Sequence, residues 1–368
     1  MDSKKKKSAT ALKVNEGIES PPPINEELLK RPLKQKDIHP AEYYVEGIIE
    51  GNRSILSQAI TLVESSLTTH QKLAQKIIES CLKKSGNSVR IGITGIPGVG
   101  KSTFIEAFGK QLTQIGHKVA VLAIDPSSQR SKGSILGDKT RMMKLSADPN
   151  AYIRPSPSAG SLGGVARKTR ETVTLCEAAG FDIIIIETVG VGQSETAVHS
   201  MVDFFLLLML AGAGDDLQGI KRGIMEMADA IVINKADGDN LPKAQQAKSQ
   251  YESALHLFPP KTSGWSPKVL LCSSIYQTGI SQIWDMMNEY IEIVKNNGYF
   301  WENRKRQSIQ LMNDTLHEYL LESFFSNPTI ENKYQQLQKK VINSELNPYK
   351  AAHELFDLYL HILSTQKA

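Results

Sequence analysis

The chain contains an unbroken phosphate-loop motif, GxxxxGK[ST], at residues 95–102, where it reads GIPGVGKS. A strand-like apolar run at 89–93 comes before the motif, and a helical segment at 103–112 follows it. This order of strand, glycine loop and helix is the context in which the motif binds phosphate. Loop N–H groups converge on an anion at a helix N-terminus, where the helix dipole also favours negative charge. The sequence therefore predicts a nucleoside triphosphate site rather than a chance glycine-rich turn.

The residue types within the motif predict separate tasks. Lys101 is expected to reach the β- and γ-phosphates, and Ser102 is expected to bind Mg²⁺. Glycines allow the backbone to approach the phosphates closely. The nucleotide-binding residues predicted from this segment are Gly95, Gly98, Val99, Gly100, Lys101, Ser102 and Thr103.

An NKxD pattern ends a second apolar strand, at 230–233, with Asn234, Lys235 and Asp237. Asp237 can accept hydrogen bonds from both the ring N–H and the exocyclic amine of guanine, whereas adenine would leave the carboxylate unpaired. Asn234 is expected to brace the loop and contact the base, and the aliphatic stem of Lys235 to lie over the ring. Ser273 is assigned to the same nucleotide-binding set. A polar surface turn is the alternative, but together with the phosphate loop the pattern favours GTP over ATP.

Apolar runs separated by helical segments predict the fold class. Continuous apolar strands are typical of a parallel sheet that helices cover on both faces, and ligands then bind at the carboxyl ends of the strands. We expect an α/β P-loop NTPase domain with a mostly parallel sheet, flanked by N-terminal and C-terminal helical segments. The predicted strands are 89–93, 118–124, 151–154, 183–187, 204–210, 230–233 and 268–272.

Composition along the chain predicts four segments. Residues 1–38 are rich in Lys, Pro and Glu and are expected to form a flexible lead-in. A helical segment at 39–85, the GTPase domain at 86–296 and a helical segment at 297–368 follow. Apolar positions of the last segment include Ile309, Leu316 and Leu320, and then Leu355 and Phe356. A stripe that a helical tail cannot bury alone often packs on a partner, so a homodimer is plausible.

Charge and cysteine usage exclude several classes of protein. The net charge of the 368 residues is only +4, so the balance does not call for nucleic acid as a partner. The longest apolar run, 204–211, is too short to span a membrane, and no secretory signal is visible. The three cysteines lie far apart in sequence, which argues against a disulfide framework and a zinc site. A cytoplasmic location fits best.

Acidic residues after two strands predict the Mg²⁺ site and the switch loops. Asp125 follows the strand at 118–124, and Asp138 lies in the glycine-rich loop after it. Glu187 ends the strand at 183–187, and the N–H of Gly190 is expected to sense the γ-phosphate. The alternative for Asp125 and Asp138 is a helix cap or a turn. The metal ligands predicted are Ser102, Asp125, Asp138 and Glu187, and the catalytic residues are Lys101, Asp138 and Glu187.

A third loop, at 211–221, combines three glycines with two acids, an amide and a lysine. Such a loop can change partners between nucleotide states, although a solvated loop with a helix cap has the same local chemistry. The residues assigned to partner coupling are Gly212, Asp215, Asp216, Gln218 and Lys221.

Taken together, the motifs GIPGVGKS, AIDPSS, ETVGVGQSE, AGAGDDLQGIKRGI and NKAD resemble, in this order and spacing, those of the MeaB/ArgK-like GTPases, the family that includes the human MMAA protein. The resemblance covers most of the chain, from about residue 40. It implies a homodimeric GTPase that chaperones adenosylcobalamin-dependent methylmalonyl-CoA mutase, loading its cofactor and protecting it from inactivation. It also implies that the isolated protein hydrolyses GTP slowly and that the mutase stimulates this hydrolysis. Gln218 and Lys221 are the residues expected to transmit the signal between the nucleotide and the mutase.

The resemblance leaves the client and the water-positioning residue open. The partner could be a related acyl-CoA mutase, and Gln193 could orient the attacking water. The chain has no DxHxxG cobalamin motif, so the corrinoid is expected to belong to the partner. Three other functions compete with the chaperone GTPase: a phosphotransferase of the transport-system kinase type, a metallochaperone GTPase, and a GTP-regulated scaffold with negligible turnover.

Overall fold

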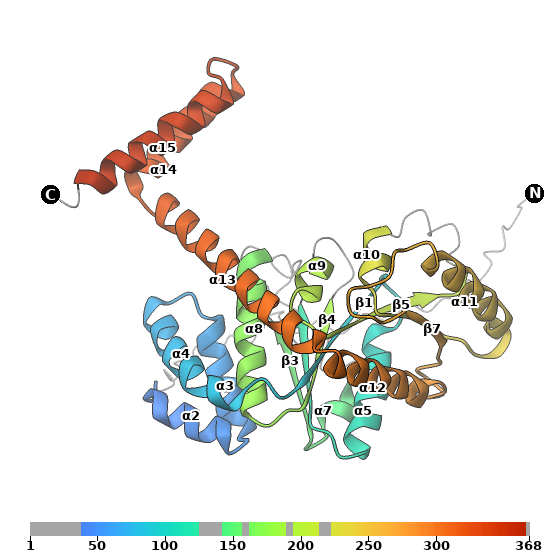
Figure 1. Cartoon of the computed structure of the whole chain (residues 1–368). Coiled ribbons are helices and arrows are strands. Elements are labelled where there is room, and N and C mark those ends of the chain that lie inside the picture. The colour runs from blue at the N-terminus through green and yellow to red at the C-terminus, as the bar shows by residue number, and fades with distance from the viewer. Residues whose placement is uncertain (1–37, 125–141, 157–161, 189–193, 213–221, 366–368) are drawn as a thin grey trace, which may run out of the picture. The chain divides into compact units, whose positions relative to one another are not determined.

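Seven parallel strands form the centre of the structure (Figure 1). The computed structural model describes residues 38–124, 142–156, 162–188, 194–212 and 222–365, and the elements below belong to the compact unit Pro40–Ala368. The order across the sheet is β3-β2-β4-β1-β5-β6-β7, and each neighbouring pair is parallel. The predicted α/β fold with a parallel sheet is therefore confirmed. The strands are β1 (Val89–Gly95), β2 (Val119–Ile124), β3 (Ala151–Ser156), β4 (Ile183–Thr188), β5 (Phe204–Leu210), β6 (Ala230–Asn234) and β7 (Lys268–Leu271).

Burial on both faces explains why these strands are continuous apolar runs. All six residues of β2 and all six of β4 are buried, as expected when helices cover both sides of a parallel sheet. The register aligns Ile93 with Glu187 on β4 and with Leu206 on β5. The carboxyl ends of the strands therefore meet at one edge of the sheet, and this edge receives the predicted site residues.

Helices pack on both faces of the sheet. One face is covered by α5 (Lys101–Gln114), α7 (Met143–Ser146) and α12 (Ile280–Asn296), which share a core with the β1 side chains Ile91 and Ile93. The other face packs against α8 (Leu162–Ala178), α9 (Ser194–His199), α10 (Arg222–Met227) and α11 (Leu241–Leu255). Because strand side chains alternate between the two faces, they form one core cluster on the first face and two on the other.

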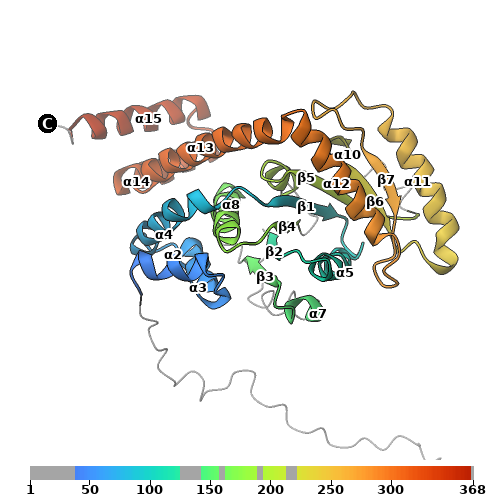
Figure 2. The same cartoon turned by 60° about the horizontal axis from the view of Figure 1, so that its bottom comes forward.

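Three N-terminal helices pack against α8 (Figure 2). They are α2 (Ala41–Ile49), α3 (Arg53–Glu64) and α4 (Thr68–Cys81). The side chain of Asn52 caps α3 by accepting hydrogen bonds from the N–H groups of Ser54 and Ile55. Two apolar residues of this segment, Ile49 and Leu82, are 46% and 55% exposed, because each lies at the end of a helical stretch.

The C-terminal helices are α13 (Tyr299–Phe325), α14 (Pro328–Ile342) and α15 (Pro348–Thr365). The last two share a small core that includes Leu337 and Leu355. Other members of the predicted apolar stripe, such as Leu316 and Leu320, are more than half exposed. None of the helices within the described ranges has both the length and the apolar character that a membrane crossing requires.

A buried ion pair fixes α13 to the amino edge of the sheet. The guanidinium of Arg304 donates to Asp203 at 2.6 and 2.8 Å, and to the carbonyls of Gly86 at 2.5 Å and Ser88 at 2.6 Å. The two charged side chains are only 11% and 2% exposed. Burial alone would lower the pKa of Arg304, but the hydrogen bonds and charge of Asp203 raise it, so the guanidinium stays charged.

We expect Arg304→Met to lower the free energy of unfolding by about 3 kcal/mol, because it leaves Asp203 buried without its ionic partner. Urea unfolding followed by circular dichroism measures this change. Lys333→Met is the matched control, since the Lys333–Glu354 pair is 3.8 Å apart with both side chains 38% exposed. Equal effects of the two substitutions would show that the Arg304 pair does not anchor α13.

Candidate nucleotide-binding site

The phosphate loop joins the end of β1 to the start of α5 at the carboxyl edge of the sheet. Two of its glycines adopt left-handed backbone conformations, with φ of 79° at Gly98 and 94° at Gly100. A Cβ at Gly100 would lie 2.9 Å from Nδ2 of Asn234. Glycine at this position therefore allows both the turn and the close approach of a second loop.

Lys101 lies inside the phosphate loop. Its ammonium donates to the carbonyls of Gly95 at 2.8 Å and Ile96 at 3.4 Å. Burial lowers the pKa of Lys101, whereas the negative charges of Glu187 and Glu195 act to raise it. The ammonium of Lys101 is thus held within the loop that the sequence predicts to bind phosphate.

Ser102 and Glu187 bring oxygen ligands together beside the loop. The Ser102 hydroxyl donates to Oε1 of Glu187 at 3.3 Å, and Glu187 is buried at the end of β4. The next residue, Thr188, donates to Thr94 at 2.8 Å and so ties β4 to β1. Hydroxyl and carboxylate oxygens fit the hard-donor preference of Mg²⁺. Within the described ranges, no group of three or more His, Cys, Asp or Glu is placed to hold a metal.

The NKxD loop after β6 is hydrogen-bonded to the phosphate loop. Nδ2 of Asn234 donates to the carbonyl of Val99 at 2.9 Å, and Nζ of Lys235 donates to the carbonyl of Gly98 at 3.0 Å. Lys235 itself has a positive φ of 59°, a conformation that non-glycine residues adopt at some cost. The base loop and the phosphate loop therefore form one connected structure.

Residues after β7 complete this structure. Oδ1 of Asn234 accepts hydrogen bonds from the hydroxyl of Ser274 at 2.8 Å, its N–H at 3.2 Å and the thiol of Cys272 at 3.4 Å. Burial raises the pKa of Cys272 to about 12, so the thiol keeps its proton. The hydroxyl of Ser273 donates to the carboxylate of Asp237. The sequence did not predict Ser274 or Cys272 as part of the site. The signal that could have found them is that β6 and β7 are parallel neighbours, so the residues that follow these two strands lie side by side.

Comparison with known proteins agrees with this geometry. Residues 56–329 match the family model described as "Methylmalonyl Co-A mutase-associated GTPase MeaB". The chain belongs to the MeaB family. GTPase ArgK of Escherichia coli (strain K12) is 47% identical over 306 residues, which is 83% of this chain and 92% of ArgK.

Two further relatives extend the comparison. The mitochondrial methylmalonic aciduria type A homolog of Mus musculus is 47% identical over 323 residues, which is 85% of this chain and 78% of the mouse protein. A crystal structure described as an LAO/AO transport system kinase has a TM-score of 0.71 and 39% identity, and covers 88% of this chain and 100% of its own. By its family and its named relatives, this MeaB-family chain is a GTPase.

The remaining predicted site residues divide into two groups. Val99 is fully buried, Thr103 is exposed in the first turn of α5, and Gly212 lies just after β5 with φ of 83°. The second group lies outside the described residues and comprises Asp125, Asp138, Gly190, Gln193, Asp215, Asp216, Gln218 and Lys221.

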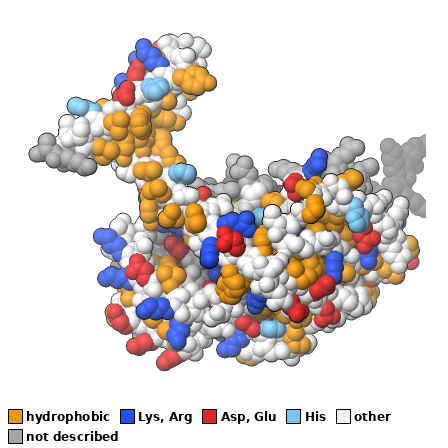
Figure 3. All heavy atoms as spheres, in the orientation of Figure 1, with side chains coloured by type: hydrophobic (Ala, Val, Ile, Leu, Met, Phe, Trp, Pro, Cys, Tyr) orange, Lys and Arg blue, Asp and Glu red, His pale blue; other side chains and the backbone are white. Residues whose placement is uncertain are grey.

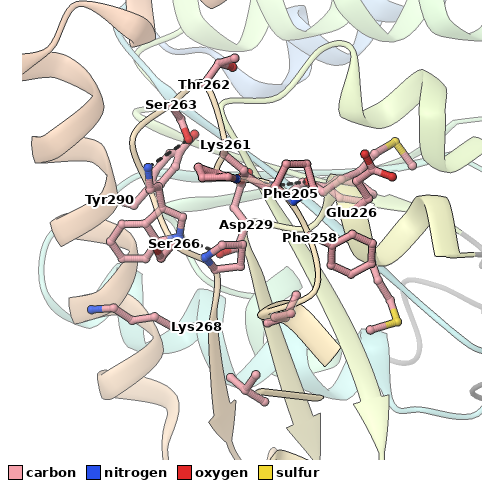
Figure 4. Close-up of a pocket in the computed structure, with 18 of the residues that line it drawn as sticks. Phe205, Glu226, Asp229, Phe258, Lys261, Thr262, Ser263, Ser266, Lys268 and Tyr290 are labelled. Carbon is pink, nitrogen blue, oxygen red and sulfur yellow. Dashed lines mark hydrogen bonds and ion pairs between the residues drawn. The ribbon is translucent and has the colours of Figure 1, made fainter. Parts of the chain in front are cut away.

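A cavity of about 830 Å³ lies at the opposite edge of the sheet, beside the residues that precede β5, β6 and β7 (Figure 4). Its polar groups bond to one another: Lys261 pairs with Asp229 at 2.8 Å, and the indole N–H of Trp265 donates to the Asp229 carbonyl at 2.8 Å. Tyr290 donates to the carbonyl of Asp203 at 2.9 Å. The cavity is thus separate from the nucleotide site of this MeaB-family protein.

We expect Ser274→Ala to weaken binding of GDP by about 3- to 10-fold, because Asn234 loses a hydrogen bond worth about 1 kcal/mol. Isothermal titration calorimetry measures the dissociation constant. Ser281→Ala, at an exposed position of α12, is the matched control and should not change it. An unchanged affinity for Ser274→Ala would mean that the other bonds of Asn234, to the Ser274 N–H, the Cys272 thiol and the Val99 carbonyl, are sufficient to hold it.

Proposed function

We propose that this GTPase is a chaperone of adenosylcobalamin-dependent methylmalonyl-CoA mutase, or of a related acyl-CoA mutase, and that it assists cofactor loading and protects the mutase. The match of residues 56–329 to a family described as mutase-associated supports the proposal most directly. The corrinoid is then held by the mutase. The three cysteines are buried free thiols, which fits the reducing cytoplasm that we propose as the location.

The connected loops suggest how the chain binds GTP. Loop N–H groups and Lys101 would hold the phosphates, and Asp237 would read the two adjacent N–H groups of guanine. Asn234 would keep the base loop at a constant distance from the phosphate loop through its bond to Val99. Because the carboxylate of Asp237 is oriented by Ser273 before the base arrives, the guanine reader is preorganised.

The oxygen ligands suggest where Mg²⁺ binds. Ser102 and Glu187 are adjacent in the structure, and we propose that Asp125 and Asp138 complete the site. When bound, Mg²⁺ supplies charge stabilisation for the transferring phosphoryl group. Glu187 and Ser102 would hold the ion. Lys101 would donate hydrogen bonds to the phosphate oxygens in place of its present bonds to the carbonyls of Gly95 and Ile96.

The end of β5 suggests how nucleotide state reaches a client. Gly212 follows β5 at the carboxyl edge, and α10 begins at Arg222. We propose that the intervening Asp215, Asp216, Gln218 and Lys221 couple hydrolysis to the mutase, and that Gly190 senses the γ-phosphate. If the attacking water is positioned well only when the client is bound, the isolated protein would hydrolyse GTP slowly.

Exposed apolar side chains on the C-terminal helices support a homodimer. Hydrophobic side chains gather over α13, α14 and α15 (Figure 3). Those more than half exposed on α13 and α15 include Ile309, Met312, Leu316, Leu320 and Phe356. A monomer rarely exposes a large contiguous apolar patch, so we propose that a second copy of the chain covers this surface.

We expect the purified chain to hydrolyse GTP slowly, to leave ATP uncleaved, and to turn over GTP faster when the methylmalonyl-CoA mutase of the same organism is added. Lys101→Ala should reduce kcat by at least about 100-fold, because the transition state loses a buried cation. Steady-state phosphate release measures these rates. Lys83→Ala, at an exposed position after α4, is the matched control.

Two outcomes, the first from this assay and the second from a separate assay with γ-labelled GTP, would contradict the chaperone proposal. GTP hydrolysis that the mutase does not change would leave a GTPase whose client lies elsewhere. Transfer of labelled γ-phosphate to an acceptor protein would favour the phosphotransferase instead.

We expect light scattering after gel filtration to give the mass of two 40.7 kDa chains. The double variant Leu316→Glu, Leu320→Glu should give one chain, because charges on the covered surface would be buried without partners. Met143→Glu, at a residue of α7 that is 68% exposed, should keep the wild-type mass. A wild-type monomer would show that the apolar surface on the C-terminal helices serves a different partner.

A further inference from the structure

Glu195 is a buried acid beside the nucleotide site for which the functions above have no task. It is the second residue of α9, which packs against β1 and β4 near the strand ends that hold Lys101 and Glu187 (Figure 1). Its exposed fraction is only 4%. A carboxylate is seldom buried to this extent unless a charged or hydrogen-bonding group compensates it.

The described residues give Glu195 little hydrogen bonding. The hydrogen bond that its carboxylate accepts within the described ranges comes from the adjacent Ser194 hydroxyl at 3.5 Å, well beyond the usual 2.5–3.0 Å for such bonds. A first-turn acid also interacts favourably with a helix dipole, but α9 has only six residues. That interaction is worth roughly 0.3–1 kcal/mol at exposed sites, which is small beside the cost of burying a charge.

The charges around Lys101 are also unequal. The negative charges of both Glu187 and Glu195 act on the Lys101 ammonium. The ammonium itself donates to the carbonyls of Gly95 and Ile96. Among the described residues, two buried carboxylates thus act on the one ammonium of Lys101, and oxygen donors of this kind suit a divalent cation.

We propose that Glu195 is a positioning residue of the magnesium site, and that its carboxylate would accept a hydrogen bond from a water ligand of Mg²⁺. This inference rests on the proposed magnesium site formed by Ser102 and Glu187. Mg²⁺ usually keeps several of its water ligands when it binds with a nucleotide, so a second acid can act through water. Glu195 would otherwise repel the triphosphate, which makes a direct contact with the nucleotide unfavourable.

Equilibrium binding of the fluorescent analogue mant-GTP, measured across a Mg²⁺ series and in EDTA, tests the proposal. We expect Glu195→Gln to raise the Mg²⁺ concentration for half-maximal binding by about 10-fold, as for other outer partners of a metal site. Its affinity for mant-GTP in EDTA should be unchanged or tighter, because a negative charge near the phosphates is removed. A merely structural role would instead weaken binding equally with and without Mg²⁺, and that result would overturn the proposal.

Two further variants sharpen the comparison. Glu195→Asp keeps the charge and should require less Mg²⁺ than Glu195→Gln, whereas equal requirements would count against the carboxylate. Glu252→Gln, on the surface of α11 with a side chain 46% exposed, should bind like wild type. Circular dichroism establishes that each variant is folded before it is titrated.

The same titration separates this inference from the functions on which it depends. Wild-type binding that is insensitive to Mg²⁺ would overturn the magnesium site and Glu195 together. If wild-type binding of mant-GTP depends on Mg²⁺ but Glu195→Gln needs the same Mg²⁺ concentration as wild type, only the role of Glu195 is overturned. The chaperone proposal is tested by the mutase and is independent of both results.

Discussion

The hydrogen bond from Asn234 to the carbonyl of Val99 joins two segments that lie 135 residues apart in the sequence. One segment is predicted to hold phosphate and the other to hold a base, so their separation has to match the length of one nucleotide. The bond is geometrically possible because glycine at position 100 leaves room for the amide, 2.9 Å from where a Cβ would lie. Ser274 then fixes the orientation of that amide. A rigid connection of this kind lowers the entropy lost when the ligand binds.

The two edges of the sheet have opposite uses. At the amino edge, charged groups bond to protein: Arg304 with Asp203, and Lys261 with Asp229. These pairs tie the starts of β5 and β6 to α13 and to the loop that covers the cavity. At the carboxyl edge, Lys101 and Glu187 are buried beside the phosphate loop, and their charges suit a ligand. A parallel sheet favours this division, because ligands of such sheets bind at the carboxyl ends of the strands.

The C-terminal helices show a limit of predictions from the spacing of apolar residues. Apolar spacing correctly predicted helices, but it could not tell a residue that packs inside, such as Leu355, from residues that remain exposed, such as Leu316 and Leu320. The spacing is the same whether a stripe meets its own chain or another one. What covers a stripe depends on the neighbours that the fold supplies, and α13 meets few of them along its outer length.

The sequence by itself determined the nucleotide-binding class, the seven strands and a mostly parallel sheet, because local motifs and continuous apolar runs depend on neighbouring residues in the chain. It also predicted Lys101, Glu187, Asn234 and Asp237 individually as site residues. Only the tertiary structure decided which residues these contact. It added Ser274, which no motif contains, and it showed that Glu195, the last residue of the ETVGVGQSE motif, is buried. Their importance arises from the order β4-β1-β5-β6-β7, which places strand ends side by side that are distant in sequence. Contacts of that kind depend on how the whole sheet assembles, and a local pattern does not record them.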